Sequence, residues 1–116
     1  MKDIPFETSH WKDEPHWMVK SFFNYVYEQN ALIPVLDQIT QRHGYGYNEE
    51  FCIFPDPNDS DPVYHFEGVM FGVGDEEIII TEAECWNYVR HVAAFYASRH
   101  GAEMATIENF LKRIEH

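Results

Sequence analysis

Basic residues are scarce in this 116-residue sequence. Eight Lys and Arg face twenty Asp and Glu, which gives a formal net charge of −12. A surface of that sign repels nucleic-acid phosphates and anionic membranes, so the composition argues against direct binding of either. It favours fast encounter with a basic partner protein, although acidity also serves solubility alone.

Cysteines are also few, and long apolar runs are absent. Cys52 and Cys85 lie far apart in apolar segments, and neither belongs to a CxxC or Cys/His metal spacing. We expect buried free thiols, with a disulfide left open. No segment approaches a membrane span, and the first residues, MKDIPFETSHW, lack the apolar centre of a signal peptide. The sequence therefore predicts a cytoplasmic protein.

The apolar content is high enough for a folded core. Hydrophobic residues make up 45% of the chain and aromatic residues 16%, which is unlike a disordered acidic tail. At this length we expect a single domain over residues 1–116. Residues 1–13 are polar and lack periodicity, so they are predicted to form an extended N-terminal arm.

Four segments show the three- and four-residue apolar spacing of amphipathic helices. Asn30 is expected to cap the second helix and Gly44 to end it. The third begins with a capping box, in which Thr81 caps the helix and Glu84 reaches back to it. The expected helices cover about residues 13–29, 32–43, 82–100 and 102–116.

The middle of the chain changes to a two-residue apolar period, which indicates strands. Strands are expected at residues 50–54, 63–73 and 76–80. Gly68 interrupts the second of them as a β-bulge would. Residues 45–47 (YGY) and 55–62 (PDPNDSDP) are predicted as loops. The sequence thus predicts an α+β fold in the order ααβββαα, with a three-stranded antiparallel sheet flanked by two N-terminal and two C-terminal helices.

The titratable residues show no specific enzyme pattern. None of the seven histidines forms a tight ligand pair, although His65 with Glu67 leaves a small hydrolase as one alternative. Cys85 lies in the first turn of a helix, where the pKa of a thiol can fall. Neighbouring Glu82 and Glu84 oppose that effect, so we expect Cys85 to pack in the core. The prediction is a protein that is not an enzyme.

The loop at residues 55–67 resembles a calcium-binding loop at several positions. Asp56, Asn58, Ser60 and Glu67 match four oxygen-ligand positions. Asp61, however, stands where such a loop requires glycine, and the prolines stiffen the chain. We therefore expect an acidic turn exposed to solvent, with no metal site and no cofactor.

Negative charge is concentrated in the middle of the chain. Eleven of the twenty acids lie between residues 49 and 84, and no Lys or Arg occurs between Arg42 and Arg90. Such charges repel one another, and a partner rich in Lys and Arg relieves the repulsion. Neighbouring aromatic residues can anchor that partner; the alternative is an acidic face without a partner. The predicted binding surface consists of Tyr45, Tyr47, Glu49, Glu50, Asp56, Asp59, Asp61, Tyr64, Glu67, Asp75, Glu76 and Glu77.

Three segments carry a resemblance to a known family. They are HWMVKSFFNYVYEQN, GYGYNEEFCIFPDP and FEGVMFGVGDEEIIIT, the last followed by an aromatic helix. Together they resemble the small immunity proteins of contact-dependent growth inhibition systems, and among these the ones that protect against ribonuclease toxins. The resemblance covers about residues 16–97 and consists of aromatic, glycine and acidic positions.

This resemblance implies a cytoplasmic inhibitor whose partner is the C-terminal toxin domain of a large surface protein from a neighbouring cell. The inhibitor would mask the active site or the substrate surface of that domain. A ribonuclease must hold phosphates, so the implied toxin is basic. A general acidic binding module, or an inhibitor that mimics nucleic acid, remains the alternative.

Overall fold

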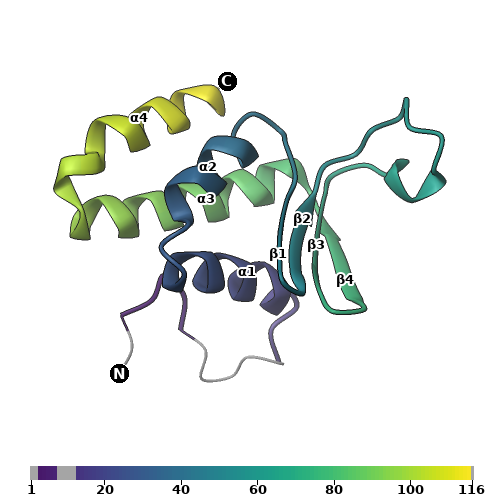
Figure 1. Ribbon diagram of the computed structural model, residues 1–116, viewed down its shortest axis with the longest axis horizontal. Coiled ribbons are helices and arrows are strands. Elements are labelled where there is room, and N and C mark those ends of the chain that lie inside the picture. Colours follow the sequence, from purple (N-terminus) through teal and green to yellow (C-terminus); the bar gives the residue numbers. More distant parts are fainter. Residues whose placement is uncertain (1–2, 8–12, 116) are drawn as a thin grey trace.

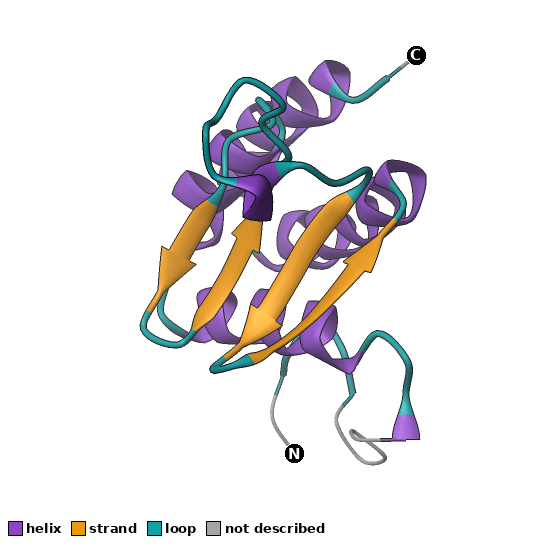
Figure 2. Cartoon of the chain, turned by 90° about the vertical axis from the view of Figure 1, so that its right-hand side faces the viewer, coloured by secondary structure: helices purple, strands orange, loops and turns teal. Residues whose placement is uncertain are grey.

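The computed structural model describes residues 3–7 and 13–115, without the side chain of Tyr47. Four α-helices and one four-stranded sheet make up the fold (Figure 1). All four α-helices lie behind the sheet when it is viewed face-on (Figure 2). In the described part of the chain, no helix has both the length and the apolar character needed to cross a membrane.

The predicted α+β class and the antiparallel sheet are confirmed, but the sheet has four strands instead of three. The strands form a meander in the order β1-β2-β3-β4, so each pairs with its neighbour in the sequence. The two N-terminal helices are α1 (Trp17–Glu28) and α2 (Leu32–Ile39), and the two C-terminal helices are α3 (Glu82–Arg99) and α4 (Met104–Arg113). The strands are β1 (Tyr45–Tyr47), β2 (Glu50–Ile53), β3 (Val69–Val73) and β4 (Glu76–Ile80).

The additional strand, β1, covers the residues predicted as a glycine-containing loop. Tyr45 pairs with Cys52, Gly46 with Phe51, and Tyr47 with Glu50. A two-residue turn joins β1 to β2, and its first residue, Asn48, takes the left-handed conformation that asparagine tolerates. Pairing with β2 thus outweighs the low strand propensity of glycine in this short segment.

The second predicted strand starts later than expected. Asp61 caps a short 3-10 helix, η2 (Pro62–Tyr64), and accepts a hydrogen bond from the backbone N–H of Val63. Gly68 is not a bulge within a strand: it precedes β3 with φ of +102°, and an added Cβ would lie 2.2 Å from the carbonyl oxygen of Ile80. These features exclude residues 63–68 from the sheet.

Two helix boundaries also differ from expectation. Asn30 has φ of +58° and lies in the turn that ends α1, while Ala31 stands at the N-cap of α2. Arg42, with φ of +64°, provides the left-handed residue after α2 that was expected at Gly44. The capping box of α3 is confirmed, since Thr81 and Glu84 exchange backbone and side-chain hydrogen bonds of 2.9 and 3.0 Å.

The core lies between the sheet and the helices and is rich in aromatic residues. The rings of Phe22 and Phe23 on α1 lie 5.5 and 5.8 Å from that of Phe71 on β3, and all three side chains are buried. Trp86 on α3 stacks on Phe54 at the end of β2, with ring centroids 6.0 Å apart. These contacts hold one side of the sheet against α1 and α3.

The predicted N-terminal arm falls partly outside the described residues, which omit residues 1–2 and 8–12. Within residues 3–7, Phe6 is buried in the core. Its backbone N–H and carbonyl both bond to the side-chain amide of Asn24, at 3.0 and 2.9 Å. Its ring stacks on His91, with centroids 4.6 Å apart. This part of the arm is therefore fixed to α1 and α3.

Candidate functional site: the outer face of the sheet

The two sides of the sheet differ in what covers them. Phe71 points toward the helices, so its cross-strand partners Cys52 and Ile78 share that side. Alternate residues of each strand point the other way, where no α-helix lies (Figure 2). We call this side the outer face; its strand residues are Gly46, Phe51, Ile53, Met70, Gly72, Glu77 and Ile79.

Phe51 occupies the middle of the outer face. Its cross-strand partners are two glycines, Gly46 on β1 and Gly72 on β3. A Cβ built on Gly72 would lie 2.1 Å from Cζ of the Phe51 ring, so the ring lies directly over the backbone of β3. Only glycine at position 72 leaves room for this arrangement.

The centre of the outer face is apolar. Ile79 on β4 is 46% exposed, and Phe51 and Ile53 on β2 are partly exposed. Met70 lies on this side by register, is 5% exposed, and is not part of the main core cluster. Phe51, Ile53 and Ile79 form a small apolar surface that the described residues leave accessible to a partner, and Met70 lies buried between them.

Acidic residues lie at both ends of this apolar surface. At one end, the β1–β2 and β3–β4 turns meet, with the N–H of Gly74 donating to the carbonyl of Glu49 at 2.8 Å. This end carries Glu49 and Asp75, both exposed. Glu76 is exposed as well, but by register it lies on the side of Ile78, which faces the helices. At the other end, the loop between β2 and β3 carries Asp56, Asp59, Asp61 and Glu67.

The acidic loop has a defined shape, because its aspartates bond to its own backbone. Asp56 accepts from the N–H of Asn58 at 3.0 Å, Asp59 from that of Asp61 at 2.8 Å, and Asp61 from that of Val63 at 3.1 Å. Each is an Asx turn, which replaces the hydrogen bonds of regular structure. The same carboxylates therefore shape the loop and give it charge.

A hollow of about 430 Å³ lies where this loop meets β1 and β2. Phe51 and Ile53 line it from the outer face, and Asp56, Asp59 and Tyr64 line it from the loop. Tyr64 is held there by a 2.9 Å hydrogen bond between its carbonyl and the N–H of Asp56. The hollow thus combines aromatic and apolar walls with carboxylates, a combination suited to a Lys or Arg side chain.

Internal ion pairs do not compensate the charge on this side. Among the described residues, the nine acids from Glu49 to Glu77 form no ion pair, whereas Lys20, Arg42, Arg99 and Arg113 are paired with acids elsewhere. Lys20 pairs with Glu14, Arg42 with Glu82, and Arg99 with Asp3. The negative potential of the loop and the turns therefore faces solvent.

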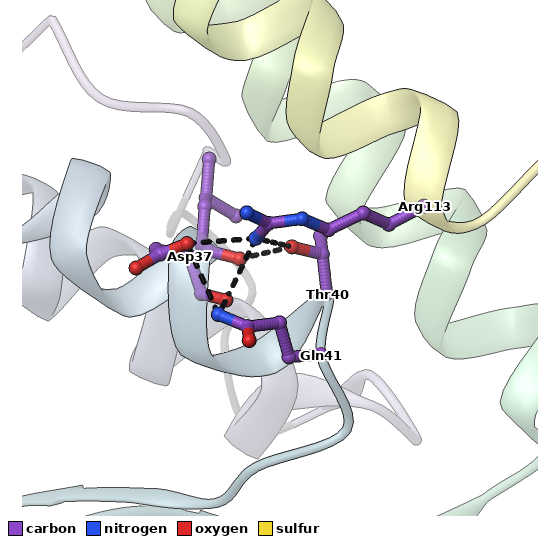
Figure 3. A network of polar contacts seen from close by, with 5 residues as sticks. Asp37, Thr40, Gln41 and Arg113 are labelled. Atoms are coloured by element: carbon purple, nitrogen blue, oxygen red, sulfur yellow. Dashed lines mark hydrogen bonds and ion pairs between the residues drawn. The ribbon is translucent and has the colours of Figure 1, made fainter.

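Arg113 shows how a basic residue is used away from this side (Figure 3). From α4 it reaches α2, where it bonds to the Asp37 carboxylate at 2.7 Å, the Asp37 carbonyl at 3.1 Å and the Thr40 hydroxyl at 3.2 Å. Gln41 donates to the same Asp37 carbonyl at 2.9 Å. The Arg113 side chain therefore connects α4 to α2, and its positive charge does not compensate the acids of the sheet and its loops.

The structure divides the predicted binding residues into three groups. The exposed acids of the loop and turns remain candidates. Glu50 does not face outward: it is half-buried, it accepts a 2.7 Å hydrogen bond from Ser21 on α1, and burial raises the pKa of its carboxyl. Tyr45 packs against the core on the same side, and the side chain of Tyr47 lies outside what the structure describes.

Sequence reasoning missed the apolar residues between the two acidic ends. The apolar pattern places Phe51, Ile53 and Ile79 in strands, but it does not say to which side of the sheet they point. The two-residue alternation in EFCIF carries that information only when combined with the cross-strand register. Because β1 was predicted as a loop, the pairing of Gly46 with Phe51 was not predicted either.

The enzyme alternatives gain little support from the structure. His65 and Glu67 line a hollow of about 580 Å³ together with Arg42 and Phe66. His65 and Glu67 are both exposed, and Nε2 of His65 lies 2.6 Å from the Asp59 carbonyl. Burial raises the pKa of Cys85 to about 12 and that of Cys52 well above its ordinary value, which is the reverse of an activated thiol. Within residues 3–7 and 13–115, no three His, Cys, Asp or Glu side chains form a metal-binding group.

Comparisons with known proteins agree with this picture. The fold is similar to the crystal structure of an immunity protein from Neisseria meningitidis MC58, with a TM-score of 0.71 over 88% of this chain and 90% of that chain, at 18% identity. A search of curated proteins gives no match. Residues 15–111, which include the whole sheet, match the family described as CDI immunity protein, where CDI is contact-dependent growth inhibition. This chain therefore belongs to the CDI immunity proteins, which are toxin inhibitors and not enzymes.

Proposed function

We propose that this protein acts in the cytoplasm and neutralises a cognate nuclease toxin, in particular a ribonuclease, by covering its basic substrate surface. One observation carries the proposal: the nine acids from Glu49 to Glu77 form no ion pair with any described residue. A nuclease binds the phosphates of its substrate with Lys and Arg. The carboxylates of an acidic inhibitor can pair with the same Lys and Arg side chains.

The charge distribution supports inhibition through electrostatic complementarity. In the free protein the exposed acids repel one another across the loop and the turns, which costs stability. Contact with a basic surface removes that repulsion and draws the partners together before they touch. Complementary charge of this kind mainly raises the association rate, and salt screens it over about 8 Å at physiological ionic strength.

The test begins with the genome: we expect the gene to lie directly downstream of a gene for a large exported toxin protein, and the C-terminal domain of that protein is then used. The two proteins are mixed, co-purified and assayed for RNA cleavage at increasing salt. We expect one-to-one binding, loss of RNA cleavage, and an association rate that falls by at least about tenfold between 50 and 500 mM salt, since steered association depends steeply on ionic strength. A salt-independent rate contradicts charge complementarity, and a toxin without nuclease activity contradicts the proposed substrate class.

A panel of unrelated basic nucleic-acid-binding proteins provides the specificity control. Immunity predicts inhibition of the cognate toxin alone. A general mimic of nucleic acid predicts comparable binding across the panel. Comparable binding to three or more unrelated proteins would contradict immunity toward one toxin and would favour a general mimic of nucleic acid.

A further inference from the structure

We infer that the toxin docks on the outer face of the sheet, with Phe51 and Ile79 in the centre of the interface and the loop and turn acids at its two ends. The inference rests on the proposed function and assigns its contact surface. The occupant it requires is a protein surface with an apolar centre and Lys or Arg residues on both sides of that centre.

The layout of the outer face is that of a protein interface. Protein interfaces place apolar and aromatic residues in the middle and polar residues at the rim. Phe51, Ile53 and Ile79 lie in the middle, the loop carries Asp56 and its neighbours at one end, and the two turns carry the other acids. No α-helix covers this side of the sheet (Figure 2).

The charge around the outer face is of one sign. Between Arg42 and Arg90 the sequence contains no Lys or Arg, and that segment forms the whole sheet and the acidic loop. Arg42, at its boundary, is paired with Glu82. Glu77 lies on the outer face itself, opposite Gly72. A docked surface thus meets negative charge beside the apolar centre, at the loop and at the turns, which fits a basic partner and repels an acidic one.

The outer face is also ordered before any partner binds. Phe51 is fixed by its position over Gly72, and the loop beside it is held by three Asx turns. Groups already ordered before binding lose little conformational entropy when the partner arrives. Fixed aromatic side chains of this kind are the usual high-energy contacts of protein interfaces.

The test substitutes one residue on the outer face and one matched residue away from it. Ile79 is 46% exposed, and Met104 on α4 is 48% exposed. Ile79→Lys places a positive charge in the proposed interface, on an edge strand, where lysine is well tolerated. Met104→Lys introduces the same side chain and the same charge on a helix behind the sheet.

The readouts are the dissociation constant for the upstream-encoded toxin domain and the melting temperature of each variant alone. We expect Ile79→Lys to weaken binding by at least about 30-fold, the effect of losing a central contact. Met104→Lys should stay within about threefold of the unmodified protein, because an added surface charge outside an interface is largely screened. Both variants should melt within a few degrees of it.

Glu77→Lys keeps the test decisive if Ile79→Lys fails to fold. Glu77 is exposed on the same face and contributes no core contact, so its reversal should also weaken binding at least about tenfold. Wild-type affinity in both outer-face variants, or an equal loss in Met104→Lys, overturns the inference and leaves toxin immunity intact. Failure of the unmodified protein to bind or protect instead overturns the proposed function itself.

The same variants distinguish a second occupant. If the unmodified protein sediments as a dimer and Ile79→Lys as a monomer, the outer face joins two copies of this chain. That result also overturns docking of the toxin on this face. A monomer in both cases, together with the expected loss of affinity, assigns the face to the toxin.

Discussion

The ring of Phe51 lies over the backbone of Gly72, with Cζ 2.1 Å from the position that a Cβ would take. The contact joins the two central strands on the side that the helices do not reach. An aromatic residue over a cross-strand glycine covers backbone that would otherwise be exposed to water. This pair therefore contributes to the stability of the sheet and to the shape of the outer face.

Gly72→Ala should destabilise the protein by about 1–3 kcal/mol, because the Phe51 ring must leave its position. Urea denaturation measures the change. Gly46→Ala is the matched control, since its Cβ would lie 4.0 Å from Cβ of the same Phe51, an ordinary contact. We expect a change within about 0.5 kcal/mol for the control. Equal destabilisation by both substitutions would show that glycine matters here for another reason.

Glu50→Gln should stabilise the protein at neutral pH. Burial under α1 raises the pKa of Glu50 in the folded state above its ordinary value, against the opposing hydrogen bond from Ser21. The folded state thus binds this proton more tightly than the unfolded chain, so stability decreases as the pH rises through the two pKa values. Glutamine never ionises and can still accept from Ser21.

The measurement compares the melting temperatures of Glu50→Gln and the unmodified protein from pH 3 to pH 8. The two should coincide below the ordinary glutamate pKa and separate above it, with the variant higher. Because Glu50 points toward α1, the variant should also bind the toxin normally. If Glu50→Gln gained no stability over the unmodified protein between pH 3 and pH 7, the raised pKa of Glu50 would be contradicted.

Two sets of substitutions should separate what the loop aspartates contribute to stability from what their charge contributes to toxin binding. Replacing Asp56, Asp59 and Asp61 with alanine removes three side-chain acceptors and should cost roughly 1–3 kcal/mol in total. Replacing the same three with asparagine keeps an acceptor at each position and removes only the charge. Asparagine supports the same Asx turns.

The triple asparagine variant should therefore melt close to the unmodified protein and associate with the toxin more slowly at low salt. Stopped-flow mixing at several salt concentrations measures this difference, which should vanish at high salt. Equal association rates at low salt would remove the loop from the electrostatic part of the mechanism.

Both thiols should be inert in the folded protein. Cys52 and Cys85 are buried and unpaired, and burial raises the pKa of both. With a pKa of about 12, only about one Cys85 in ten thousand is a thiolate at pH 8. An aromatic disulfide reagent should label neither cysteine before denaturation and both afterwards. Rapid labelling of the folded protein would contradict the buried positions.

The sequence predicted the elements with strong local signals. The capping box at Thr81 and Glu84 begins α3, and the helical spacing located all four helices to within a few residues. β1 was missed because Gly46 lowers strand propensity in a three-residue segment, and only the partner strand shows that it pairs. Residues 63–68 alternate like a strand, but the cap at Asp61 and the positive φ of Gly68 exclude them from the sheet.

The candidate site was predictable in its charge and less so in its apolar part. A run of 47 positions without Lys or Arg is visible in the sequence and needs no fold. Whether Glu50 or Phe51 faces outward depends on the register of β2 against β3 and on which side α1 covers. Those are long-range contacts, and no local pattern specifies them.

Because helices cover only one side of the sheet, the two sides of each strand can change independently during evolution. Along β2 and β4, neighbouring residues serve different tasks: Cys52 and Ile78 support the interior, while Ile53 and Ile79 do not. If the toxin docks on the outer face, substitutions in the outer set can change which toxin is recognised while the interior set keeps the same packing. With the outer face as docking surface, one stable scaffold can follow a changing toxin by single substitutions at alternate positions.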